Sequence, residues 1–224
     1  MKNSYFGFIT AASIAALTTA CGGQETQVIE NFFLAVKAKD TQTVAAFSMA
    51  QFDQEAKSWN VKSVGEEQRV PAPLSALSKT LKDVDELAAQ NKKDAGAYFN
   101  AHPLEVDKVK PMVESGGAVP ANLQKTAADW KKFNDADKDL KAKAAEAKAA
   151  YERERRTMGM SMNPGSVNDA LAGDLITRAA TVEVEIGSGE KKTYTITIRK
   201  YEVAPPGKTV KIQSRWLIQS ITPQ

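Results

Sequence analysis

Cys21 is the side chain with the most distinctive chemistry in this sequence. It is the only cysteine among 224 residues, so it has no disulfide partner within the chain. The three residues before it are small, and before them Tyr5 to Leu17 runs without a charge behind Lys2. This order of charged, apolar and small residues is typical of a secretory signal peptide. The apolar run is shorter than the roughly 20 residues of a membrane-spanning helix, and an unpaired cysteine in an exported protein needs a use.

A small residue directly before a cysteine resembles the lipobox of bacterial lipoproteins. In that family the thiol receives a diacylglycerol, the signal peptide is cut before the cysteine, and the new amine is acylated. The chain departs from the family pattern where it has Thr18, because the usual leucine lies one residue further back, at Leu17. The resemblance implies a signal peptide over residues 1–20 and lipidation at Cys21. The alternative is an ordinary secreted protein with a spare thiol.

The lipid would attach the chain to a membrane, since each buried methylene contributes about 0.8 kcal/mol and several acyl chains give stable anchoring. Gly22, rather than Asp, follows the cysteine. By the same resemblance, this favours the outer membrane over the inner membrane. The expected location is the outer membrane, facing the periplasm, with the inner membrane or the cell surface as alternatives. The balance of 30 basic against 27 acidic residues gives no reason to expect nucleic acid as a partner.

Three methionines, Met158, Met160 and Met162, form the one unusual cluster of possible metal ligands. Thioethers suit Cu(I) in an exported compartment. In an extended segment, alternate spacing would place all three on one side. The competing interpretation is a loop that tucks the methionines under a sheet.

Other chemistry is sparse. His102, the only histidine, precedes Pro103 without any nucleophile signature, and it is interpreted as a surface or capping residue. The carboxylates of Asp135, Asp137, Asp139 and Glu146 interleave with lysines and indicate a solvated helix face. No catalytic residue and no cofactor are predicted.

Two helices, a strand and a helical hairpin are expected ahead of the methionines. Val28 to Val36 carries an apolar stripe at helical spacing, Asp40 or Thr41 can cap a second helix, and Trp59 to Val64 is typical of a strand. From Leu74 to Arg156 the pattern predicts a helical hairpin, or a three-helix excursion, with antiparallel coiled-coil packing. Breaks are expected at residues 91–94 and 158–165, and a short helix at 167–171.

The C-terminal part is predicted to be an antiparallel β-meander. Alternating apolar residues indicate strands over 181–186 and 194–199, joined by a turn at 187–189. The apolar phase then slips, which a β-bulge near Arg199 and Lys200 would explain. Val210 to Ile218 supplies the last strand. One face of this three-stranded sheet is expected to be covered and the other polar.

The order of these elements resembles the cone-shaped α+β fold of nuclear transport factor two and ketosteroid isomerase. The likeness depends on Val28 to Val36 with its Phe32–Phe33 pair, on Asp40 and Phe47, and on the closing strand at residues 215–218. It implies a cone-like domain over residues 21–73 and 164–224, with residues 74–163 as a helical-hairpin insertion. No catalytic residue of the family is carried over, because the inner stripe of the first helix holds no acid or tyrosine.

Two classes of function stay open, beside a purely structural spacer made by the hairpin, which the apolar or polar character of the hairpin tip would distinguish. The first is a non-catalytic envelope lipoprotein whose cone offers a hydrophobic pocket or surface to a partner protein, with the hairpin as a reaching arm. The second is a small-molecule enzyme, isomerase- or dehydratase-like, that uses a pocket acid. Convergent buried polar groups with perturbed pKa values would favour the enzyme. A cone filled or lined only by apolar side chains would favour the binding module.

Overall fold

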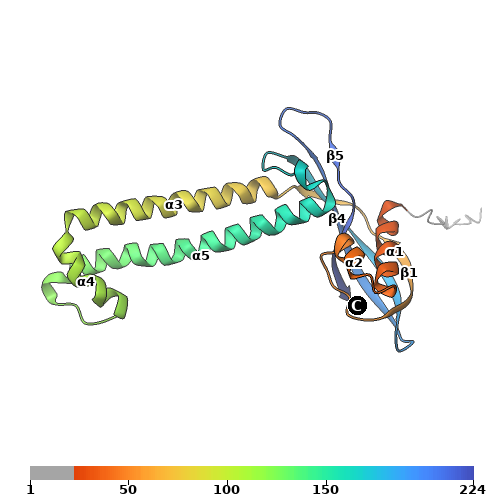
Figure 1. The fold of residues 1–224 in the computed structure, drawn as a ribbon, viewed down its shortest axis with the longest axis horizontal. Helices are drawn as coiled ribbons and strands as arrows, with labels where there is room; N and C mark the ends of the chain where they lie inside the picture. The colour runs from red at the N-terminus through yellow and green to blue at the C-terminus, as the bar shows by residue number, and fades with distance from the viewer. Residues whose placement is uncertain (1–22) are drawn as a thin grey trace, which may run out of the picture.

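A computed structural model describes residues 23–224, so the predicted signal peptide and Cys21 lie outside the described residues. The structure is an α+β body with a long two-helix arm (Figure 1). This confirms the expected fold class: two N-terminal helices, a curved antiparallel sheet and a long helical hairpin. The elements are α1 (Gln24–Lys37), α2 (Thr41–Phe47), β1 (Ala56–Val64), β2 (Gln68–Pro71), α3 (Leu74–Ala101), α4 (Pro103–Ser115), η1 (Ala121–Leu123), α5 (Gln124–Ser161), η2 (Pro164–Ser166), β3 (Ala172–Ile186), β4 (Lys191–Ala204), β5 (Ile212–Gln213) and β6 (Leu217–Pro223).

The sheet has six strands where the sequence predicted a three-stranded meander. Its central hairpin, β3 and β4, pairs without a register shift from Ala172 opposite Ala204 to Glu185 opposite Lys191. β1 and β2 pair with the outer edge of β3, while β5 and β6 pair with β4. The short helix expected at 167–171 is wrong, because backbone and side-chain bonds to Asn168 turn the chain there into β3. Pro71 is tolerated within β2 because that strand pairs on one side only.

The main core lies between α1 and one face of the sheet. Phe32 and Phe33 on α1 are fully buried, and Phe33 stacks on Trp59 of β1 with ring centroids 5.5 Å apart. Asp40 caps α2 as expected, accepting a hydrogen bond from the Thr43 N–H at 3.0 Å. The sheet contributes inward-facing, even-numbered residues of the central hairpin: Ile176, Ala180, Val182, Val184, Ile186, Tyr194, Ile196 and Ile198.

A second, smaller core lies on the opposite face of the sheet. Along β4 the buried residues change from even-numbered positions to Arg199, Tyr201 and Val203, although the pairing with β3 stays regular. The bulge predicted near Arg199 and Lys200 is absent from the β3–β4 pairing, but a register shift lies close by, where Thr197 and Ile198 pair with Ser220 and Ile218 of β6. The phase slip also coincides with a change of buried face. The cover for this second face comes from Leu74, Met158, Val167 and Leu171. The prediction that Val210 belongs to the apolar face is also wrong, since this residue is 77% exposed.

The arm consists of α3 packed antiparallel on α5, with α4 folded against its far end (Figure 1). The break predicted at residues 91–94 is wrong, because Asn91 lies inside the arm and its amide donates to the Phe133 carbonyl at 3.2 Å. α3 therefore continues to Ala101, and the aromatic rings of Tyr98 and Trp130 pack near Phe133. At 1.5 Å per residue the 38 residues of α5 span about 57 Å.

Candidate functional site

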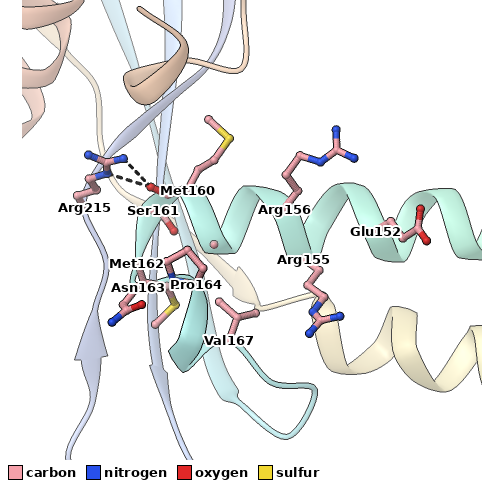
Figure 2. Close-up of a pocket in the computed structure, with 11 residues that line it drawn as sticks. Glu152, Arg155, Arg156, Met160, Ser161, Met162, Asn163, Pro164, Val167 and Arg215 are labelled. Carbon is pink, nitrogen blue, oxygen red and sulfur yellow. Dashed lines mark hydrogen bonds between the residues drawn. The ribbon is translucent and has the colours of Figure 1, made fainter. Parts of the chain in front are cut away.

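The end of α5 meets the body at Arg215, and we call this contact the joint. Its guanidinium donates to the Met160 carbonyl at 2.9 and 2.8 Å and to the Ala46 carbonyl at 3.1 Å, while its backbone N–H donates to the Ser161 carbonyl at 2.9 Å (Figure 2). The last carbonyl groups of a helix have no partner within it and favour a cation. The Arg215 side chain thus supplies hydrogen bonds to one carbonyl group near the end of α5 and one near the end of α2, and it fixes how the arm joins the body.

A buried polar network lies beneath this joint. The Glu154 carboxylate of α5 accepts hydrogen bonds from Arg199 at 2.7 Å and from the Tyr201 hydroxyl at 2.6 Å. All three residues are buried, and the Arg199 Nε has no hydrogen-bond partner among residues 23–224. Burial raises the pKa of the Tyr201 phenol, so it stays a neutral donor to the carboxylate. Because Glu154 of α5 accepts from both Arg199 and Tyr201 of β4, the network pins α5 to β4.

A hollow of about 990 Å³ opens beside the joint, on the exposed side of the last turns of α5 (Figure 2). Apolar groups from Met160, Met162, Pro164 and Val167 line it, and Gly159 leaves its floor open. Arg155 and Arg156 extend to opposite sides of α5 at its rim. The arrangement combines a shallow apolar surface with positive charge.

The three methionines are not held together. α5 continues to Ser161, so Met158 and Met160 are helical and the expected extended segment is not formed. Residues two apart on a helix point roughly 200° apart. Met158 is fully buried in the second core, whereas Met160 and Met162 line the hollow and point away from each other. The Cu(I) hypothesis therefore loses the geometry on which it depended.

The other predicted residues lie away from the joint. His102 sits at the corner between α3 and α4, with its Nδ1 3.3 Å from the Glu105 carboxylate. The carboxylates of Asp135, Asp137 and Asp139 form exposed ion pairs with lysines one turn away, as a solvated helix face requires. Over residues 23–224, no three His, Cys, Asp or Glu side chains are grouped to hold a metal.

Sequence reasoning missed the joint. Glu154 lies in a run of charged residues typical of a solvated helix, and the phase slip beside Arg199 predicts a bulge rather than a buried ion pair. The phase slip in β4 was the available signal, because a strand that changes its buried face also shows such a slip.

Comparisons with family models, curated proteins and solved structures found no match to this chain. In the described part of the chain, no helix is both long and apolar enough to cross a membrane.

Proposed function

We propose that this chain is a non-catalytic interaction module of the bacterial envelope, anchored by lipid at Cys21 to the outer membrane and facing the periplasm. The observation that carries the proposal is the arm. A pair of helices, one about 57 Å long, extends from the body and packs mainly on itself. Such an element can hold a partner protein at a distance from the body.

The start of α1 supports this arrangement. α1 lies on the side of the body away from the arm (Figure 1). Gln24 follows Cys21 by three residues, and three residues span at most about 11 Å. A lipid on Cys21 would therefore keep the body next to the membrane while the arm extends away from it.

The contents of the body favour a binding module over an isomerase- or dehydratase-like enzyme. The buried cluster between α1 and the sheet is made of apolar side chains, and the Glu25–Arg178 ion pair that also joins α1 to β3 is partly exposed. The buried charged residues Glu154 and Arg199 lie on the opposite face and are paired with each other. The relationship to nuclear transport factor two stays a prediction from the order of elements.

Two experiments test the proposal. Cys21→Ser should move the protein from the membrane fraction to the soluble fraction, and its retention on membranes in detergent-free extracts would contradict the lipid anchor. Photo-crosslinking groups placed in cells at Leu104, which is 76% exposed at the far end of the arm, and at Val210 on the body would then locate the partner. A discrete crosslinked product from Leu104 is expected, and no product from either site would contradict an interaction module.

A further inference from the structure

The hollow at the joint is part of a longer groove. A second hollow of about 600 Å³ lies between α5 and the end of α2, and it shares Glu152, Arg156 and Met160 with the first. The two together cross the last turns of α5. We call this surface the arginine–methionine groove; its members are Ala45, Met49, Ala149, Glu152, Arg153, Arg155, Arg156, Gly159, Met160, Met162, Pro164 and Val167.

The groove carries excess positive charge. Arg153, Arg155 and Arg156 are exposed, and none of the three forms an ion pair with another residue of the described chain. The single carboxylate of the groove, Glu152, lies 3.9 Å from Lys148. Several lysines on the shaft of the arm, by contrast, are paired with acidic residues one turn away, as Lys141 is with Asp137. The three arginines at the joint have no such partner within residues 23–224.

We propose that the arginine–methionine groove binds an acidic, amphipathic segment of a partner protein. The inference rests on the proposed function and names the chemistry of the partner. Methionine side chains adapt to varied apolar surfaces, and both Met and Arg are enriched at protein interfaces. The groove is open to solvent, whereas small-molecule sites enclose most of their ligand. Free arginines at the rim select a segment with carboxylates beside its apolar side chains.

The groove is pre-formed, because hydrogen bonds hold the last turns of α5 against the body. Arg215 holds the end of α5 through the Met160 carbonyl, and Glu154 holds the preceding turn to β4. A rigid groove loses little conformational entropy when a segment binds.

The test is a titration of the soluble chain from Gly22 onward with a fluorescent helical peptide that has Leu and Met on one face and Glu on the other. Matched peptides replace Glu with Gln or with Lys, and dodecyl phosphate is titrated as a small anionic amphiphile. The acidic peptide should bind saturably, and more tightly than the Gln peptide. The affinity should fall as NaCl rises from about 0.1 to about 1 M.

Two variants locate the binding. The double variant Arg155→Gln with Arg156→Gln should lower the affinity for the acidic peptide about tenfold. Lys92→Gln with Lys93→Gln removes the same charge from an exposed part of α3 and should leave the affinity unchanged. Gly159→Leu should also weaken binding, since its side chain would occupy the floor. It should fold, because a Cβ at Gly159 meets Pro164 only at an ordinary 3.9 Å and Leu favours a helix.

Equal affinity for the acidic and Gln peptides, or no loss in the double arginine variant, would overturn the proposal. Arginine-dependent binding of dodecyl phosphate without binding of the peptide would also overturn it, in favour of a small amphiphile. A crosslink from Leu104 in cells does not depend on the groove, so failure here would leave the proposed function standing.

Discussion

The two cores of this protein are built differently, although both use β4. The main core joins α1 to neighbouring strands mainly through apolar side chains, and its one ion pair in the described chain, between Glu25 and Arg178, lies partly exposed. The second core draws Leu74, Met158 and Leu171 from distant parts of the chain and adds a buried charged network. The base of the arm is thus the cover for one face of the sheet, and the arm beyond it packs mainly on itself.

The largest effect should come from removing the base of the arm. Replacing Ser75 to Met158 with a short Gly/Ser linker exposes Tyr201 and Val203 and removes the partner of Arg199, so we expect aggregation or loss of cooperative unfolding. Replacing only residues 89–143 keeps the base and should retain one cooperative transition in denaturant. A soluble, cooperative protein from the longer deletion would show that residues 21–73 and 164–224 fold without the arm, as the sequence-based domain division requires.

Breaking the charged network should cost about 3–5 kcal/mol of unfolding free energy. Glu154→Leu leaves the Arg199 guanidinium buried without its carboxylate. Replacing both residues, Glu154→Leu with Arg199→Met, should recover most of the loss, because apolar pairs of similar volume often substitute for buried ion pairs. Denaturant unfolding of the two single variants and the double variant measures the coupling. Additive losses would mean that the two side chains do not stabilise the joint together.

The neighbouring methionines provide a sharper comparison. Met158→Ala should lower the unfolding free energy by about 2–5 kcal/mol, because Met158 is fully buried in the second core. Met160→Ala should change it by about 0.5 kcal/mol or less, since Met160 lines an open hollow. Thermal and denaturant unfolding of the two variants measures the difference. Equal effects would contradict the placement of Met158 against the sheet and of Met160 in the hollow.

The sequence predicted local features better than the joint. The apolar stripe of α1, the Asp40 cap and the turn at 187–189 each depend on residues a few positions apart, and each is present. The second core depends on which helices pack on the face of β4 that carries Tyr201 and Val203. A slip in apolar phase fits either a bulge or a second cover, and periodicity cannot distinguish them. Arg215 gave no local signal, because its role comes from the ends of two distant helices.

The smallest effect concerns the face of the sheet opposite the second core. There Asp174 and Glu202 lie directly opposite each other on β3 and β4, and Arg69 contacts them at 3.4 and 3.0 Å. Hydrogen bonds from Lys211 and then Arg69 lower the pKa of Glu202 below its ordinary 4.5. A carboxyl group whose pKa is lower in the folded state stabilises the fold at pH values above its unfolded-state pKa. This contribution is lost as the pH falls through the folded-state pKa.

Arg69→Gln should therefore destabilise the fold near pH 7, where two carboxylates then face each other. The difference from the parent should shrink as the pH falls below the ordinary 4.5 and through the lowered pKa of Glu202, because that carboxylate then becomes protonated. It should also shrink in about 1 M salt, because the side chains are partly exposed and screened. Denaturant unfolding at several pH values measures this difference in unfolding free energy. Lys92→Gln, which removes a charge away from this face, is the control. A difference that persists unchanged at low pH would mean that Arg69 stabilises β2 by packing rather than by its charge.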